Sequence, residues 1–278
     1  MTRTIASALW LGALILSTAV IGGEALADSI WTTHGDGTQI ATIDLATGAG
    51  ANVGNTGQPD TFAAAFDNTD GTLYTTFNGF SDLGPVSPGA AKLGKVDQST
   101  GAVSTIGSLG TQMVALEVDA SGQLWGVGYK DRILYQIDKT SGFTTGIGIT
   151  DIEDVMDLAF HSSGTLYATA DNFLYSLNLA TGAATLEAFF TGIVSGAEVM
   201  AIMFDSSDSF FATAHVENSP LYSLDVVTGV ATVTGAPLLD MPHGGDIFIS
   251  PVSVPEPSSL LLLTLGLLVS AAGRFPRA

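Results

Sequence analysis

Three histidines and two aspartates are the side chains that we single out for chemistry: His34, His215, His243, Asp157 and Asp246. Imidazole nitrogens and carboxylate oxygens together are ligands for zinc and other divalent transition metals. A metal held in this way could activate water for a hydrolase or a lactonase. The spacing of the five residues matches no metal-binding signature. Two alternatives to a metal site therefore stay open. The three histidines could be unconnected surface residues, and the two aspartates could bind backbone amides of loops.

Other catalytic chemistry has no support in the sequence. The chain has no cysteine, no G-x-S-x-G nucleophile elbow and no recognisable Ser/His/Asp grouping. Residues 67–71 (DNTDG) look like a calcium loop, but they lack the later bidentate glutamate of an EF-hand, so we interpret them as a hairpin turn. We predict no catalytic residues and favour a protein that is not an enzyme.

The charge balance restricts the partners. The chain has 8 Lys and Arg against 27 Asp and Glu, which gives a formal net charge of −19. Binding to nucleic acid requires cationic side chains that neutralise phosphates, so nucleic acid is excluded as a partner. A divalent cation, or a polymer bridged by cations, suits this acidic chain better. The alternative interpretation is that the negative charge only keeps an exported protein soluble.

The elements that must position the candidate side chains come from a sequence repeat with five copies. Each copy has an Asp or Asn followed by a Thr-Gly or Ser-Gly pair, with an apolar stretch on either side. The acidic or amide side chain accepts hydrogen bonds from the backbone a few residues on, and the glycine supplies the positive φ that closes a hairpin. The copies run from Asp44 to Gly48, Asp97 to Gly101, Asp138 to Gly142, Asn178 to Gly182 and Asp225 to Gly229.

A second turn precedes this one in four of the copies, where an apolar strand ends and an apolar-aromatic pair opens the next strand. Two hairpins in each repeat give four strands over roughly 40 to 50 residues, which is the period of a β-propeller blade. We therefore predict an all-β, five-bladed β-propeller over residues 28–251, flanked by two hydrophobic targeting helices at the ends of the chain. A β-sandwich or an open β array is the alternative architecture. The pairs are Leu73-Tyr74, Leu124-Trp125, Leu166-Tyr167 and Phe210-Phe211.

The first repeat lacks its innermost strand. It opens directly at Ile30 and Trp31, whereas residues 245–250, at the other end, align with residues 200–205 of the fifth repeat. A C-terminal strand that completed the N-terminal blade would close the ring and remove its exposed sheet edges. We predict that the N- and C-terminal strands close one blade in this way.

The propeller topology sorts the loops onto two faces. The regular Asp/Gly turns lie on one face and the variable connections on the other, where binding usually occurs. His34, His215 and His243 all fall on connections of this second face. Asp157 and Asp246 fall on innermost strands, in a column otherwise filled by alanines, near the mouth of the channel. This placement predicts a metal or ligand site at the channel mouth.

The N-terminal residues 1–27 have the features of a signal peptide. Arg3 is the only charged residue before Glu24, and residues 5–21 are apolar. Ala25 and Ala27 supply the small residues of an A-x-A cleavage site. We predict cleavage after Ala27, with a retained anchor as the alternative.

The C-terminal residues 252–278 combine three features. Pro255, Glu256 and Pro257 precede an apolar run over residues 260–272, and Arg274 and Arg277 follow it. The run is shorter than the roughly 20 residues that cross a bilayer upright. Arginines on one flank could still hold a short transmembrane helix with that flank in the cytoplasm. The prolines cannot extend the helix.

This tail closely resembles the PEP-CTERM sorting signal, which has the same three parts in the same order. The resemblance implies recognition by an exosortase, a membrane transpeptidase-like enzyme, and removal of the tail. It also implies an exported protein, at the cell envelope or outside the cell, that is transiently anchored in the inner membrane. Such proteins come from bacteria that make exopolysaccharide. A plain C-terminal membrane anchor is the alternative.

Two functions are compatible with these observations. The first is a secreted or envelope-associated, non-enzymatic β-propeller with a binding or scaffolding role in the extracellular matrix, where polysaccharide or a matrix protein is the partner. The second is a metal-dependent propeller hydrolase or lactonase with its site at the channel mouth. The repeat units also look like those of a functionally diverse group of β-propellers, so the fold does not choose between the two.

Overall fold

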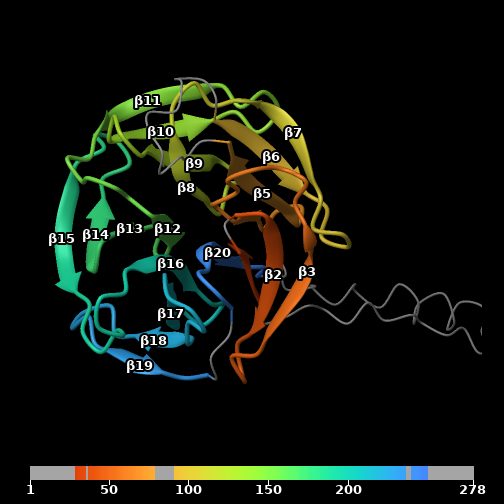
Figure 1. The fold of residues 1–278 in the computed structure, drawn as a ribbon. Coiled ribbons are helices and arrows are strands. Elements are labelled where there is room, and N and C mark those ends of the chain that lie inside the picture. Colours follow the sequence, from red (N-terminus) through yellow and green to blue (C-terminus); the bar gives the residue numbers. More distant parts are fainter. Residues whose placement is uncertain (1–28, 36, 79–90, 236–238, 250–278) are drawn as a thin grey trace, which may run out of the picture.

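The computed structural model describes residues 29–35, 37–78, 91–235 and 239–249. Within these ranges the chain forms five four-stranded antiparallel sheets, arranged as blades around a central axis (Figure 1). The prediction of an all-β, five-bladed propeller is confirmed. The two predicted hydrophobic targeting helices lie outside the described residues.

The strands of each blade run from the axis to the rim. Blade 1 consists of β20 (His243–Ile247), β1 (Ser29–His34), β2 (Gln39–Asp44) and β3 (Gly50–Asn55). Blade 2 consists of β4 (Ala65–Asp67), β5 (Thr72–Phe77), β6 (Lys92–Val96) and β7 (Val103–Ser108). Blade 3 consists of β8 (Met113–Val118), β9 (Leu124–Gly128), β10 (Ile133–Ile137) and β11 (Thr144–Ile149). Blade 4 consists of β12 (Asp157–Phe160), β13 (Leu166–Ala170), β14 (Phe173–Leu177) and β15 (Ala184–Phe189). Blade 5 consists of β16 (Val199–Phe204), β17 (Phe210–Ala214), β18 (Tyr222–Leu224) and β19 (Ala231–Val233).

Burial decreases from the axis to the rim. The inner strands β8 and β16 are buried at every position, whereas the rim strand β15 exposes most of its residues. An inner strand packs between neighbouring blades, so it is apolar on both faces, while a rim strand has solvent beside it. Aromatic side chains fill the space between blades. Trp31 of blade 1, for example, meets Phe66 of blade 2 edge to face, with ring centroids 6.0 Å apart.

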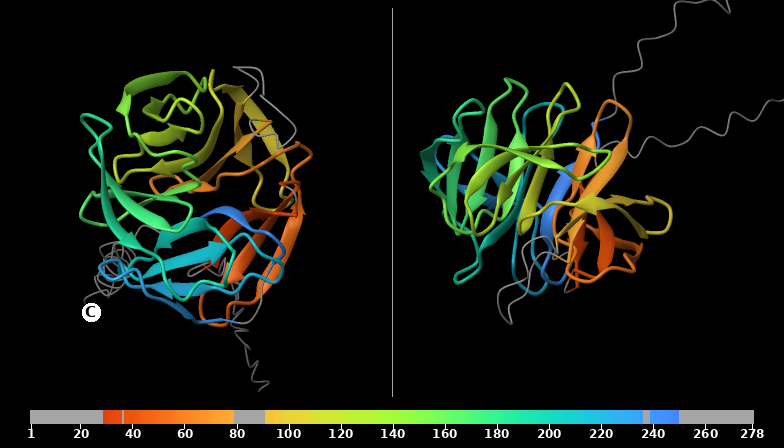
Figure 2. Two further views of the ribbon diagram at one scale, coloured as in Figure 1. Left: turned by 60° about the vertical axis from the view of Figure 1, so that its left-hand side comes forward. Right: turned by 90° about the horizontal axis from the view of Figure 1, so that it is seen from above.

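The ring is closed by the pairing of its two ends, as predicted. β20, in blue, lies beside β1, in red (Figure 2). The two strands are antiparallel, with Ile247 opposite Ile30. The register differs from the sequence alignment by two residues, because Ile247, and not Ile249, occupies the place that Phe204 holds opposite Phe210 in blade 5. A shift of two residues keeps each side chain on the same face of the strand, so the apolar pattern alone did not reveal it.

Truncation of a core side chain in this closing strand is expected to destabilise the whole ring. Ile247 is 2% exposed and packs in one cluster with Ile30 and Met203. Ile247→Ala should therefore lower the free energy of unfolding by about 2–5 kcal/mol. The measurement is urea unfolding of the full chain in mild detergent. Val233→Ala on the rim, where Val233 is 56% exposed, is the control and should change the free energy by less than about 0.5 kcal/mol. Equal losses in the two variants would contradict closure by β20.

The Thr-Gly turns have the predicted hairpin chemistry. In the turn between β2 and β3, the Gly48 N–H donates to the Asp44 carbonyl at 2.7 Å, and the Thr47 N–H donates to the Asp44 carboxylate at 2.8 Å. Gly48 has a φ of 71°, and the glycines of the other four turns lie in the same left-handed region. The side-chain acceptor and the left-handed glycine together close the hairpin.

Each turn glycine also contacts the rim strand of the preceding blade, or the residues just beyond it. This contact is a structural role of the repeat that the sequence pattern did not predict. The same close backbone approach recurs at all five blade interfaces, and its last copy joins blade 5 to blade 1. The pairs are Gly101 with Gly54, Gly142 with Gly107, Gly182 with Gly148, Gly229 with Phe189, and Gly48 with Gly235.

Candidate functional site

Three histidines lie at one end of the central axis of the ring, which we call the channel mouth, on the face opposite the Asp/Gly turns. His34 ends β1, His243 begins β20, and His215 follows β17. The rings of His215 and His243 have centroids 5.0 Å apart and are inclined at 48°. The fourth histidine, His161, lies on the other face, in the turn between β12 and β13.

The histidine environments keep two of the imidazoles neutral. His243 is 6% exposed and stacks edge to face on Phe62, with ring centroids 4.7 Å apart. Burial, together with the neighbouring His215 and His34, lowers the pKa of His243 to about 3. Burial also lowers the pKa of His34, and the charge of Asp240 opposes that change. His243 is therefore uncharged near neutral pH and cannot donate a proton there as an imidazolium.

Two imidazole nitrogens at this mouth have no hydrogen-bond partner within the described part of the chain. They are Nδ1 of His243 and Nε2 of His34, and both atoms are buried. Burial of a polar atom without a partner costs about 1–3 kcal/mol. A buried polar atom without a hydrogen-bond partner is uncommon in a folded protein, and a bound ligand or ion is one explanation for it.

The two candidate aspartates bind backbone amides from other blades. Asp157 Oδ2 accepts from the N–H of Ile202 at 2.9 Å and from the N–H of Gly245 at 3.3 Å. Asp246 Oδ2 accepts from the N–H of Phe66 at 2.6 Å. Each inner strand turns one edge toward the channel, and the N–H groups along such an edge lack strand partners. The aspartates supply acceptors for some of them and join adjacent blades.

Asp157 and Asp246 occupy different levels of the channel. Asp157 lies opposite Thr169 on β13, whereas Asp246 lies opposite Trp31 on β1. The position equivalent to Asp246 in blade 3 is Glu117, which lies opposite Trp125 on β9. The two aspartates therefore do not share one column, although all three carboxyl groups are on the same face of their strands.

Glu117 is the residue that the sequence reasoning missed. It is 5% exposed, and burial, followed by the charge of Asp246, raises its pKa well above the usual value. Burial also raises the pKa of Asp157, and it raises that of Asp246 to about 7. The available signal was a charged residue inside the apolar strand MVALEV. Three carboxyl groups from three blades thus share the buried interior of the ring.

The carboxyl and histidine groups do not form a closed metal site. Among the described residues, no group of three His, Cys, Asp or Glu side chains surrounds one point in a way that could hold a metal ion. The calcium-like loop is a hairpin turn, as predicted, because Asp67 accepts from Thr69 at 3.0 Å and pairs with Lys139 from the next blade. Within the described ranges, no helix is long and apolar enough to cross a membrane.

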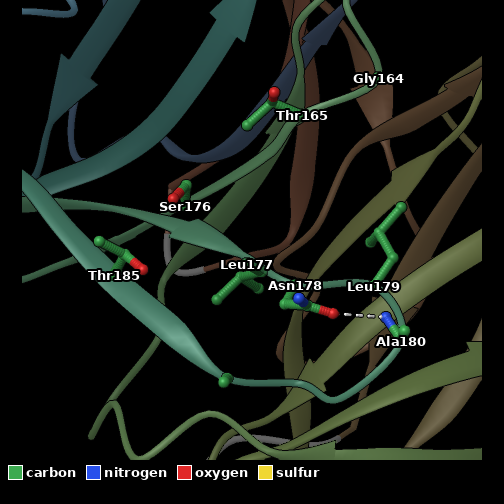
Figure 3. A pocket seen from close by; sticks show the side chains of 9 residues that line it. Gly164, Thr165, Ser176, Leu177, Asn178, Leu179, Ala180 and Thr185 are labelled. Atoms are coloured by element: carbon green, nitrogen blue, oxygen red, sulfur yellow. Dashed lines mark hydrogen bonds between the residues drawn. The ribbon is translucent and has the colours of Figure 1, made fainter.

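A separate hollow of about 510 Å³ lies on blade 4 (Figure 3). Its polar lining is neutral and includes Thr165, Ser176, Asn178 and Thr185. The Asn178 side chain is already engaged, because its Oδ1 accepts from the N–H of Ala180 at 2.9 Å. The Ser176 hydroxyl is engaged as well, because it donates to Glu187 Oε1 at 2.5 Å, and the Thr165 hydroxyl lies 3.1 Å from that of Ser163. Hydroxyl groups of this kind can exchange hydrogen bonds with a polar ligand.

Comparisons with known proteins give one sequence motif and one partial relative. Residues 253–278 match the PEP-CTERM protein-sorting motif, so the predicted sorting residues lie in the matched segment, although they are outside the residues that the structure describes. Over 78 residues, or 28% of this chain, the sequence is 41% identical to Phase 2 flagellin from Salmonella abortus-equi. The chain spans 16% of the length of that flagellin.

Solved structures share the fold at low sequence identity. A structural genomics protein of unknown function from Bacteroides thetaiotaomicron has 14% identity and a TM-score of 0.54, over 80% of this chain and 62% of that chain. A chain of a nidogen/laminin complex has 13% identity and a TM-score of 0.52, over 80% of this chain and 98% of that chain. Likeness at this level shows the fold alone.

The sequence match and the fold together support one coarse statement about the protein. The chain combines a five-bladed β-propeller with a C-terminal PEP-CTERM protein-sorting motif, and it is therefore an exported, envelope-sorted protein that an exosortase, a membrane enzyme, processes.

Proposed function

We propose that this protein is a non-enzymatic binding or scaffolding propeller of the extracellular matrix, with exopolysaccharide as its partner. The observation that carries the proposal is the PEP-CTERM motif at residues 253–278, because it directs the propeller to the cell envelope. The signal peptide would be cleaved after Ala27. The C-terminal helix would anchor the chain in the inner membrane until the exosortase removes it.

The side chains of the propeller agree with binding more than with catalysis. The buried carboxyl groups of Asp157 and Asp246 bind backbone amides, and the hollow on blade 4 is lined by neutral groups. A polysaccharide presents many hydroxyl groups, which can exchange hydrogen bonds with threonine, serine and asparagine side chains. The net charge of −19 favours a neutral glycan, or an acidic one bridged by cations.

We expect the full chain, in mild detergent and metal-free buffer, to bind neutral polysaccharides on a glycan array. Thr185→Trp should reduce this binding at least about tenfold, because the indole would fill the hollow on blade 4; a tenfold change corresponds to about 1.4 kcal/mol. Thr145→Trp is the matched control, since Thr145 has the same place opposite β10 that Thr185 has opposite β14. The control should bind like the unmodified chain.

A metal-dependent hydrolase or lactonase is the second candidate function, and the observation in its favour is the meeting of His215 and His243 at the channel mouth. The same glycan preparations distinguish the two functions. New reducing ends or lactone opening that a chelator abolishes would favour the hydrolase. Retention without turnover is the result that we expect. If no glycan is either retained or turned over, the polysaccharide proposal is overturned.

A further inference from the structure

We propose that His215 and His243 chelate a divalent transition-metal ion, such as zinc, at the mouth of the channel, and that the ion keeps open positions for ligands from outside the protein. The two residues come from different blades, because His215 follows β17 of blade 5 and His243 begins β20 of blade 1. The site therefore exists only in the closed ring. The inference goes beyond the proposed function, since metal binding does not require a glycan.

The spacing of the two rings fits chelation. A zinc–nitrogen bond of about 2.0–2.1 Å places the centroid of an imidazole roughly 3.2 Å from the metal. Two such rings at a tetrahedral angle have centroids roughly 5.2 Å apart. The centroids of His215 and His243 are 5.0 Å apart. Two packed aromatic side chains can also have this spacing, and the unpartnered ring nitrogen of His243 distinguishes the pair from such packing.

The buried ring has a nitrogen that lacks a partner. Nδ1 of His243 makes no hydrogen bond with any residue that the structure describes, although the side chain is 6% exposed. His215 is exposed, and it provides the second ring from the solvent side. Nearby Asp240, whose charge is felt by His34, adds a field that favours a cation.

We expect open coordination positions on the metal ion because, among the described residues, no third ligating side chain joins His215 and His243. No group of three ligating side chains surrounds one point among the residues that the structure describes. The carboxylates of Asp157 and Asp246 are committed to the backbone amides of Ile202, Gly245 and Phe66. Imidazole is a good ligand for zinc, copper and nickel and a poor one for calcium and magnesium. The pair thus selects a transition metal and leaves positions for water or a carboxylate or hydroxyl group of a bound molecule.

Titration of the full chain with zinc tests the site directly. The protein is purified in mild detergent without a histidine tag, and binding is followed by calorimetry. We expect one zinc ion per chain, and His215→Ala and His243→Ala should each weaken binding at least about tenfold. His161→Ala is the matched control, because it also removes a histidine, but on the opposite face, where His161 contacts Ser163. The control should bind zinc like the unmodified chain.

Thermal unfolding separates loss of the site from loss of the fold. A ligand that binds only the folded protein stabilises it by mass action. Zinc should therefore raise the Tm of the unmodified chain and of His161→Ala, but not that of His215→Ala, whose side chain is exposed and whose metal-free Tm should be unchanged. Equal zinc affinity in the unmodified chain and in His215→Ala would overturn the proposal. It would also be overturned if His161→Ala lost as much zinc affinity as His215→Ala. Glycan binding in metal-free buffer is measured separately, so a failure here leaves the proposed function standing.

Discussion

Gly148→Ala is expected to destabilise the propeller by about 3 kcal/mol or more, which is at or above the upper end for overpacked sites. A Cβ at this position would lie well inside van der Waals contact with the carbonyl oxygen of Thr181, in the turn of the next blade. The obstacle is backbone and not a flexible side chain, so relief requires two blades to move apart. Urea unfolding of the full chain in mild detergent gives the loss as a shift of the transition midpoint.

Gly146→Ala supplies the control for the same strand. A Cβ at Gly146 would be 3.4 Å from its nearest neighbour, Cγ2 of Ile133, which is an ordinary contact, and Gly146 does not have a positive φ. Replacement of glycine by alanine at a compatible site has a small and often favourable effect, about 0.4–1 kcal/mol, through the unfolded chain. Similar midpoints for the two variants would show that the blades are not held together by this close approach.

The second large effect is a decline of stability between pH 6.5 and pH 8. Burial raises the pKa of Glu117 and Asp157, and it raises that of Asp246 to about 7. The folded chain holds these protons more tightly than the unfolded chain, so their contribution is complete at acidic pH and is lost as the pH rises through the folded pKa. Each carboxyl group whose pKa in the folded chain lies above this pH range lowers the free energy of unfolding by about 1.4 kcal/mol per pH unit. His243, with its lowered pKa, acts in the opposite direction, but only below pH 6.5.

Glu117→Gln isolates one of these groups. The amide keeps the shape of the side chain and an acceptor for the Val118 N–H, which donates to Glu117 Oε1 at 2.9 Å. We expect the variant to be more stable than the unmodified chain at pH 8, with a pH slope that is shallower by up to about 1.4 kcal/mol per pH unit. Glu187→Gln, at an exposed site on β15, should leave both values unchanged. A stability that stays flat or rises from pH 6.5 to 8 would contradict burial of the three carboxyl groups.

The repeat predicted the architecture because hairpins are local. An acceptor such as Asp44 and a left-handed glycine such as Gly48 lie within five residues of each other, so their chemistry is visible in the sequence. The pairing of β20 with β1 was also predictable, since the first repeat lacked a strand and the last residues supplied one. The register of that pairing was not, because a two-residue shift leaves the alternation of side chains unchanged.

The candidate site was predicted in part. The topology placed three histidines on one face, and the structure adds that His215 and His243 are adjacent. The sequence grouped Asp157 with Asp246 and overlooked Glu117, because the apolar pattern of β8 gave no reason to consider a charged side chain inside it. The functions of these groups as amide acceptors depend on the N–H groups of other blades, which the sequence cannot position.

The sequence by itself determined the blade count, the hairpin turns and the C-terminal sorting motif, because each depends on residues that are neighbours along the chain. Only the tertiary structure decided which glycines meet between blades, which carboxyl groups share the buried interior, and which imidazoles pair at the mouth. These contacts join residues such as Gly48 and Gly235, or His215 and His243, that belong to different blades. The physical reason is that ring closure sets the distances between blades, and the local pattern within one repeat carries no information about them.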